Sequence, residues 1–235
     1  MVENFNGPEP YPVMPSKKRC ALKRGANPSL TRVQLKDVSR IVLEIRSKCE
    51  RKRAQLIEQF ETEVQKVGTR LHRAADEDSV IEYIKQVSED RHAKTAIGWN
   101  EVPLDRADLE RSLQRVSVKY STEASDENFI RSAVSADLGI SGVDYVLADT
   151  GTLVLLARTG QARSISLLPP VHIAVVHAEQ LLSSLDDLFP LVRLESDLAS
   201  AITFITGPSR TADIELTLVV GVHGPQELHV VLMQG

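Results

Sequence analysis

Hydrophobic positions recur every three or four residues in the front part of the chain, and short apolar runs replace this spacing further on. The helical spacing runs from Val33 to Val67, and Gly68 is a typical helix stop, so one or two amphipathic helices are predicted there. After Gly68, strand-like runs alternate with helical spacing, which predicts an α/β fold with a mostly parallel sheet. The expected strands are 69–73, 94–99, 116–120, 143–147, 152–157, 171–177, 202–206 and 228–233, and the expected helices are 76–89, 103–113, 128–136, 178–189 and 195–201.

The same pattern divides the chain into three parts. Residues 1–28 are rich in proline and glycine and carry the basic cluster Lys17–Arg19, so they are predicted to be a poorly ordered leader. Residues 29–53 form a helical extension, and 54–235 form the α/β domain. The chain lacks an apolar run of about 18 residues, so we expect no membrane span, no secretory signal and a cytoplasmic location.

Charge is divided unevenly between the two halves of the chain. The net charge of −4 is the sum of +5 in residues 1–120 and −9 in residues 121–235. A basic front half is compatible with nucleic-acid binding, but solvated helix surfaces are the preferred explanation. Aromatic residues make up only 4% of the chain, too few for a base-stacking platform. Nucleic acid is therefore not expected as a partner.

A small polar turn, Ala148-Asp149-Thr150-Gly151-Thr152, separates two of the expected strands. The hydroxyls, backbone N–H groups and single carboxylate of such a turn can face a ligand. The alternative is an ordinary hairpin turn in which Gly151 takes a positive φ. The residues alone leave both interpretations open.

The segment Gly207-Pro208-Ser209-Arg210-Thr211-Ala212-Asp213-Ile214-Glu215 directly follows the expected strand 202–206. In an open α/β sheet, ligands bind beyond the C-terminal ends of the strands. Ser209 or Thr211 can cap a following helix whose free N–H groups attract an anion, and Arg210 adds a positive charge. The alternative is a capped helix start with Arg210 in solvent. The segment is not a P-loop, because the lysine and second glycine of that motif are missing.

A third polar segment, Gly221-Val222-His223-Gly224-Pro225, precedes the last expected strand. Its two glycines permit a tight backbone path, and His223 can titrate near neutral pH or donate to an anion. A purely structural histidine is the alternative. Arg158 and Arg163 flank a Thr-Gly-Gln-Ala loop and are candidates for the same cleft.

No motif in the sequence identifies an enzyme. There is no Ser-His-Asp order, HExxH pattern, paired-carboxylate motif or GxGxxG. Cys20 and Cys49 belong to no CxxC and to no Cys/His cluster with metal-ligand spacing, so no metal or cofactor is expected. His172 and His177 lie among apolar neighbours and are expected to be core histidines bonded to backbone groups. The residues therefore predict a pocket for a small anionic ligand at the C-terminal ends of the strands.

Four of these segments, taken together, resemble a known family. They are Ala148–Leu155, Leu167–Val176, Gly207–Glu215 and Gly221–Pro225. Their order and approximate spacing resemble the lactate utilization protein C family, also called LUD-domain proteins, from about residue 54 to the end. The resemblance implies a three-layer α/β/α fold with a mostly parallel central sheet, similar to the NagB/RpiA/CoA transferase-like class of sugar-phosphate isomerases and CoA transferases.

The resemblance also implies a bacterial role in the oxidation of L-lactate to pyruvate. Three proteins encoded together act there as a set, and the partners carry the iron–sulfur clusters. The absence of cluster cysteines from this chain fits the non-cluster member. No position matches the glutamate nucleophile of a CoA transferase, so no catalytic residue is assigned. The candidate ligand-binding residues are Asp149, Thr150, Gly151, Thr152, Arg158, Arg163, Gly207, Ser209, Arg210, Thr211, Asp213, Glu215 and His223.

Two further functions stay open at this point. A stand-alone isomerase or acyl-transfer enzyme acting on a phosphorylated or CoA-linked small molecule would use Asp149, Asp213 or Glu215 as its acid or base. A nucleic-acid or regulatory binder would use the basic leader and the charged segment Arg46–Arg53, and its binding would fall steeply with salt. The partners expected under the leading hypothesis are the iron–sulfur proteins and a small carboxylate or phosphate. A homo-oligomer is also left open.

Overall fold

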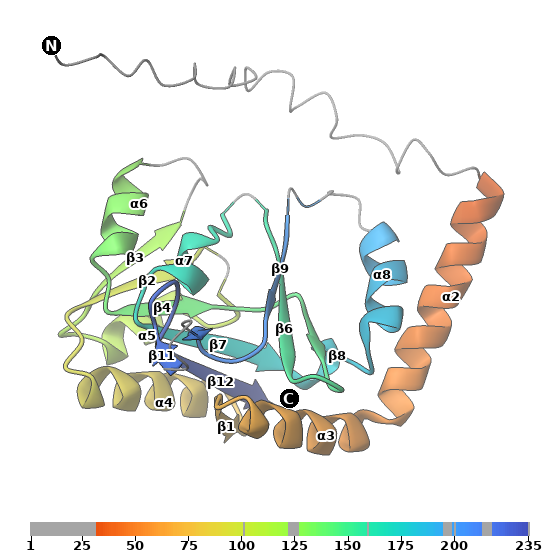
Figure 1. Ribbon diagram of the computed structural model, residues 1–235, viewed down its shortest axis with the longest axis horizontal. Helices are drawn as coiled ribbons and strands as arrows, with labels where there is room; N and C mark the ends of the chain where they lie inside the picture. The colour runs from red at the N-terminus through yellow and green to blue at the C-terminus, as the bar shows by residue number, and fades with distance from the viewer. Residues whose placement is uncertain are drawn as a thin grey trace, which may run out of the picture.

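A single parallel sheet of six strands forms the centre of the molecule (Figure 1). The computed structural model describes residues 32–100, 102–121, 127–158, 160–194, 199, 201–212 and 218–234. The strand order is β1-β12-β7-β4-β2-β3, and every neighbouring pair is parallel. The strands are β1 (Arg70–Ala74), β2 (Thr95–Trp99), β3 (Ser117–Ser121), β4 (Leu138–Ser141), β7 (Val171–His177) and β12 (Glu227–Met233).

Two neighbouring inner strands of the sheet, β7 and β12, are buried on both faces. All of β7 from Val171 to Val176 is buried, and Leu228 to Leu232 of β12 are buried as well. Near-continuous apolar runs are typical of parallel strands that helices cover on both sides. The predicted central position of 171–177 is therefore confirmed.

Helices cover both faces of this sheet. On one face, Tyr83 of α4 (Glu77–Asp90) bonds to His229, and Arg106 of α5 (Arg106–Ser112) stacks over Tyr120. On the other face, α7 (Ser164–Leu167) passes over Gly139 so closely that a Cβ there would meet the carbonyl of Ile165. The helix α6 (Glu127–Val134) contacts α7 and β3. Because side chains alternate between faces along each strand, these contacts place α4 and α5 opposite α6 and α7, and the α/β/α class is confirmed.

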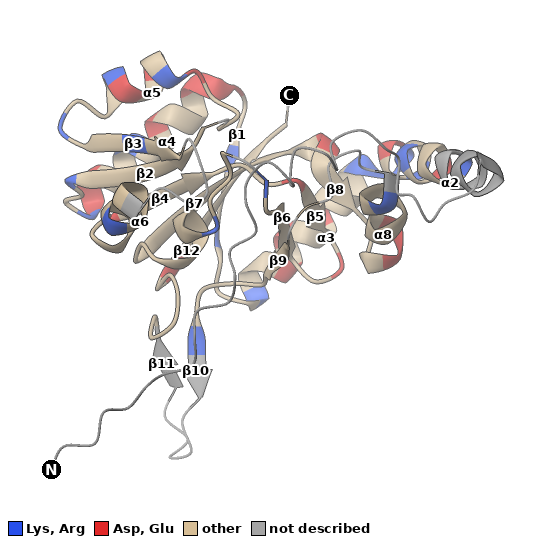
Figure 2. Ribbon diagram, turned by 90° about the horizontal axis from the view of Figure 1, so that it is seen from above, with Lys and Arg blue, Asp and Glu red and all other residues tan. Residues whose placement is uncertain are grey.

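A second sheet continues from the ends of two central strands. Its order is β8-β5-β6-β9, with β5 (Tyr145–Leu147) following β4 along the chain and β8 (Leu181–Leu182) following β7. The strand β6 (Thr152–Leu156) is antiparallel to β5 and to β9 (Ile202–Ile205). A separate antiparallel pair, β10 (Arg210–Ala212) and β11 (Leu218–Val220), lies between β9 and β12 in the chain. The strand β10 stands away from both sheets (Figure 2).

The predicted amphipathic helices are α2 (Arg32–Arg51) and α3 (Arg53–Lys66). Leu56, Phe60 and Val64 of α3 are buried at helical spacing, as the pattern predicted. The helix α2 packs against α8 (Leu185–Leu194), and the Lys48 ammonium lies 3.0 Å from the Asp187 carboxylate. None of the helices in the described ranges has the length and apolarity needed to cross a lipid bilayer.

One expected helix was wrong, and some short elements were missed. Residues 178–189 do not form one helix: a short 3₁₀ turn (Ala178–Gln180) leads into β8, and α8 begins only at Leu185. Pairing of Leu181 and Leu182 with β5 accounts for this break, because tertiary pairing overrides helix propensity. The elements β4 and α7 were not predicted, being only four residues long each. Most of the expected helix 195–201 lies outside the described residues.

Candidate functional site

The polar turn 148–152 is the connection between the antiparallel strands β5 and β6. Gly151 has a φ of 65°, as the hairpin interpretation requires. A Cβ on Gly151 would lie 2.8 Å from the backbone nitrogen of Val64, so only glycine allows α3 to pack this closely on the turn. Asp149 and Thr150 are exposed at the tip. The hairpin is thus confirmed, and two polar side chains of the turn are exposed to solvent.

A chain of three threonine hydroxyls joins this turn to the end of β9. The Oγ1 atoms of Thr150 and Thr152 lie 2.8 Å apart, and the Oγ1 atoms of Thr152 and Thr206 are also 2.8 Å apart. Thr152 is buried at the centre of the chain, while Thr150 and Thr206 are exposed at its ends. Sequence reasoning missed Thr206, because nothing in the local pattern shows that β9 pairs with β6.

The backbone of Ser209 connects the second polar segment to the third. The Ser209 N–H donates to the Pro225 carbonyl at 2.8 Å, and the Gly221 N–H donates to the Ser209 carbonyl at 3.0 Å. Segments 206–210 and 221–225, which are separated in sequence by β10 and β11, therefore lie side by side. His223 is exposed in this third segment. Three of the polar segments singled out in the sequence meet in one region.

Arg210 does not precede a helix, and that expectation was wrong. Residues Arg210–Ala212 form β10, which pairs with β11, so neither Ser209 nor Thr211 caps a helix. The guanidinium of Arg210 is instead exposed and donates to the Val67 carbonyl at 2.8 Å, just past the end of α3. A cation is favourable at a helix C-terminus, where unpaired carbonyls gather. One N–H of Arg210 is used in this way. The rest of the guanidinium faces solvent.

The position of this region relative to the sheet also corrects the sequence interpretation. The strand β9 belongs to the second, mixed sheet, so the loop after it does not lie at the C-terminal edge of the parallel sheet. The Gln226 N–H bonds to the carbonyl of Pro170, one residue before β7. Segments 206–210 and 221–226 therefore lie beside the N-terminal ends of β7, β12 and β1.

Arg158 and Arg163 are not part of this region. Arg158 forms an ion pair with the largely buried carboxylate of Asp144, which also accepts the Leu156 N–H at 2.6 Å. Leu156 pairs with Ile202 at the end of β6 remote from Thr152, which separates Arg158 from the threonines by most of the strand. Arg163 is exposed at the start of α7. Asp213 and Glu215 lie outside the described residues.

We call Thr150, Thr152, Thr206, Ser209 and Arg210 the threonine–arginine site. It combines hydroxyl groups, which donate or accept hydrogen bonds, with one permanent positive charge. Such a set can hold a carboxylate or phosphate. Asp149, beside this site, is exposed. Two cavities, of about 860 and 440 Å³, lie elsewhere on the molecule, and Asp149 lines neither of them. Among the described residues, no group of three or more metal-ligating side chains comes together.

Two buried histidines of the parallel sheet lie outside this site. His172 is fully buried, and its Nε2 lies 2.8 Å from the Ser141 hydroxyl, so its partner is a side chain and not the backbone group expected. Burial lowers the pKa of His172 to about 3. The Nδ1 atom of His229 lies 2.9 Å from the Tyr83 hydroxyl, within hydrogen-bond distance. Burial lowers the pKa of His229 as well. Both rings are therefore neutral at pH 7.

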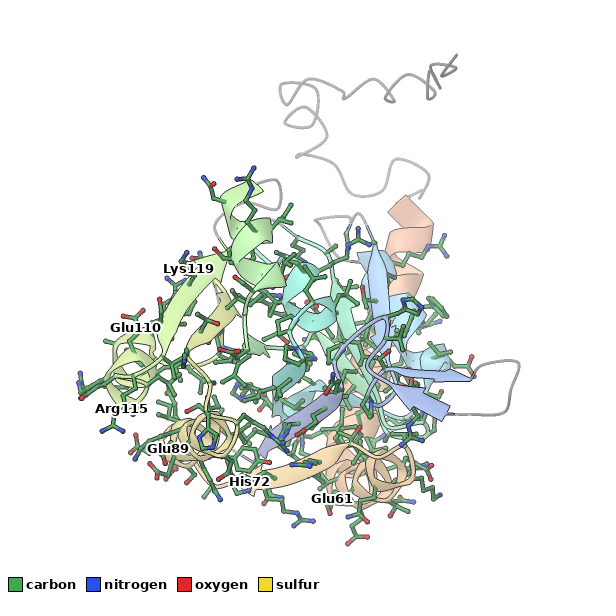
Figure 3. All side chains as sticks on the ribbon, turned by 60° about the vertical axis from the view of Figure 1, so that its left-hand side comes forward. Glu61, His72, Glu89, Glu110, Arg115 and Lys119 are labelled. Atoms are coloured by element: carbon green, nitrogen blue, oxygen red, sulfur yellow. The ribbon has the colours of Figure 1, made fainter. Side chains whose placement is uncertain are left out.

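Glu227 organises the polar groups around His229. Its Oε2 lies 3.2 Å from His229 Nε2, and its carboxylate pairs with Arg91 at 2.7 Å and Arg70 at 3.3 Å. His72, which is labelled in Figure 3, stacks on the Tyr83 ring with 4.1 Å between the ring centroids. The cluster bonds α4 to β1 and β12. Sequence reasoning missed it, since its members are scattered singly from residue 70 to residue 229.

The fold and the threonine–arginine site together define an α/β/α protein with a polar hairpin region at one edge of a parallel sheet. A family model described as "LUD domain" matches residues 57–233, so the chain belongs to the LUD domain family. The resemblance noted in the sequence is thereby confirmed.

Individual relatives agree with this membership. The chain is 40% identical over 152 residues to "Lactate utilization protein C" of Halalkalibacterium halodurans and 39% identical over 136 residues to the protein of that name from Shouchella clausii. These matches cover 63% and 57% of this chain and 66% and 59% of the two relatives. The matches thus span about three fifths to two thirds of the relatives' own length.

A solved structure shares the fold. The crystal structure of a DUF162 family protein from Deinococcus radiodurans superposes with a TM-score of 0.55 at 21% identity. The superposition covers 77% of this chain and 98% of that one. At this level of identity, the comparison supports the architecture of the chain and not its chemistry.

Proposed function

We propose that this protein acts in the cytoplasm in the utilisation of L-lactate, as the member of a three-protein set that carries no iron–sulfur cluster. In this proposal it holds a small carboxylate or phosphate at the threonine–arginine site, or docks there to the iron–sulfur proteins that oxidise lactate to pyruvate. The relatives named lactate utilization protein C support the pathway. The observation that carries the site is the meeting of three polar segments through Thr152–Thr206 and Ser209–Pro225.

The chemistry of the site fits a small monoanion better than a reaction centre. Arg210 supplies charge, and the exposed hydroxyls of Thr150 and Thr206 supply hydrogen bonds whose donors can turn toward an anion. Among the described residues, neither Asp149, exposed at the hairpin tip, nor His223, exposed in segment 221–225, hydrogen-bonds to these groups. We therefore propose binding, and assign no catalytic step to this chain.

Growth tests the pathway. In a host with no other route for lactate oxidation, deletion of the gene should abolish growth on L-lactate and leave growth on pyruvate unchanged. The wild-type gene should restore growth, whereas Arg210→Ala with Thr206→Val should restore it poorly. Arg193→Ala, a matched change of an exposed arginine on α8, should complement fully. Undiminished growth of the deletion strain on L-lactate would refute the pathway assignment.

Ligand-induced stabilisation tests the site separately. A ligand that binds the folded state raises the melting temperature by mass action, so we expect lactate, pyruvate or phosphate to raise that of the wild-type protein. Arg210→Ala should remove the response and Arg210→Lys should keep part of it, since lysine preserves the charge but not the planar fork. Comparing each variant with and without ligand removes the effect of losing the bond to Val67. An undiminished response in Arg210→Ala would place the ligand elsewhere.

A further inference from the structure

A cavity of about 860 Å³ lies at the N-terminal ends of β2 and β3, between the last turns of α4 and α5. Small-molecule sites commonly enclose about 300–1,000 Å³, so this volume suits a metabolite. Figure 3 labels Glu89 on α4 and Arg115 after α5 at this corner of the molecule. The lining residues are Lys85, Ser88, Glu89, His92, Ala93, Lys94, Arg111, Ser112, Leu113, Gln114, Arg115 and Val116.

The lining has a closed floor and a charged rim. Ser88, Ala93 and Leu113 are buried beneath the cavity, whereas Lys94 and Arg115 are exposed around it. The floor is held in place by the turn that ends α4, where His92 adopts a φ of 50° and the Ala93 N–H donates to the Ser88 carbonyl at 2.9 Å. The cavity is therefore built by ordered backbone and not by side chains alone.

Positive charge dominates the rim. The lining carries four cationic side chains, namely those of Lys85, Lys94, Arg111 and Arg115, against the single carboxylate of Glu89. His92 adds a ring N–H that can donate a hydrogen bond. A concave surface lined by one sign of charge concentrates ions of the opposite sign.

Carboxylates outside the cavity offset only part of this charge. The Lys85 ammonium lies 3.4 Å from the Glu82 carboxylate on α4, and the Arg111 guanidinium lies 2.6 Å from the Asp108 carboxylate on α5. Both pairs are exposed. Exposed pairs of this kind are weak and exchange readily for another anion. Asp137 also attracts Lys94, and its carboxylate is held in place by the backbone N–H groups of Lys94 and Thr95, at 2.8 and 2.9 Å. Arg115 forms no ion pair with any described residue.

We infer that this cavity is a second binding site, for a compact multivalent anion such as a pyrophosphate ester or a tricarboxylate. It is distinct from the threonine–arginine site, which lies beside β1 and β12, whereas the cavity lies beside β2 and β3 toward the other edge of the sheet. Four cations on a common rim favour several negative charges on one small molecule over a single carboxylate, because each added charge meets another cation.

Calorimetric titration of the full chain with inorganic pyrophosphate and with citrate tests the inference. At low salt at least one probe should bind, and its affinity should fall as salt is added. Preference for pyrophosphate would identify a phosphate ligand, and preference for citrate a carboxylate one. The double variant Lys94→Gln/Arg115→Gln should weaken binding by about tenfold or more, as the loss of half the rim charge implies.

A matched double variant serves as the control. Arg46→Gln/Lys52→Gln removes the same charge from exposed positions in the α2–α3 region and should change the affinity by less than about twofold. Thermal melts of both doubles establish that they fold. Absence of binding by either probe at low salt, or equal weakening by both doubles, would overturn the inference. Lactate plays no part in this assay, so a negative result here would leave the proposed function standing. A negative result in the lactate growth test would likewise leave this inference standing.

Discussion

At the scale of single residues, His172 and His229 show how the sheet core selects a protonation state. Both rings are almost completely buried and bonded to hydroxyl groups, and burial lowers the pKa of each. A charged imidazolium would have to leave water for surroundings that cannot solvate it. Folding is therefore coupled to deprotonation at both positions.

This coupling predicts acid sensitivity. The pKa of His172 is about 3 when folded and about 6.5 when unfolded, so between these values the unfolded chain binds a proton that the folded chain does not. The free energy of unfolding should thus be highest above pH 6.5 and fall below it by about 1.4 kcal/mol per pH unit for each such proton. In urea titrations at pH 7, 6 and 5, His172→Gln should show a shallower fall than wild type. Thr150→Ala, a change of an exposed side chain that does not titrate, should follow the wild-type slope.

Gly151 is a second residue whose role can be measured. Alanine there would place a Cβ 2.8 Å from the backbone nitrogen of Val64 and would keep a φ of 65° that L-residues disfavour. Left-handed strain and overpacking together predict a loss of about 2–4 kcal/mol of stability. Thr150→Ala, at the exposed neighbouring position, should cost under about 1 kcal/mol. Equal denaturation midpoints for the two variants would show that α3 does not press on this turn.

At the scale of elements, α2 depends on a polar contact as well as on apolar packing. Lys48 Nζ lies 3.0 Å from both oxygens of Asp187, whose side chain is only 8% exposed and also accepts the Ser183 N–H at 3.2 Å. Lys48→Met should destabilise the protein by about 1–2 kcal/mol, because it leaves a nearly buried carboxylate without its cation. Lys52→Met, at an exposed position, is the control, and chemical denaturation followed by circular dichroism is the measurement. A loss no larger than that of the control would show the pair to be dispensable.

Elements with strong local patterns could be predicted from sequence, and those set by distant pairing could not. The helix α4 was predicted because Val80, Ile81, Ile84 and Val87 share one face, and the structure adds that the Asp76 side chain caps its start. Residues 210–212 were assigned to a helix start, since Ser and Thr are good caps, yet pairing with β11 makes them a strand. The site shows the same division. The hairpin at Gly151 could be predicted from the local sequence. The contacts of Thr206 with Thr152 and of Arg210 with the Val67 carbonyl could not, because they join residues that are distant in the sequence.

At the scale of the whole molecule, the two sheets and the β10–β11 pair should differ in local stability. The strands β7 and β12 are buried on both faces and bonded on both sides, whereas β10 and β11 form an isolated pair three residues long. Two-stranded pairs are marginal on their own. Hydrogen exchange should therefore be slowest in 171–177 and 228–232 and fast in 210–212 and 218–220. Protection of β10 equal to that of β7 would contradict this ranking.

The pairing of β1 with β12 has a consequence for how the molecule is made. The first strand of the parallel sheet bonds only to the last one, whose register pairs Arg70 with His229 and Ala74 with Met233. During synthesis, β1 leaves the ribosome long before its partner exists, and β7 has an open edge until β12 arrives. Contacts between such distant segments slow folding and leave strand edges unprotected in the meantime. The nascent chain is therefore most vulnerable to aggregation just before β12 emerges.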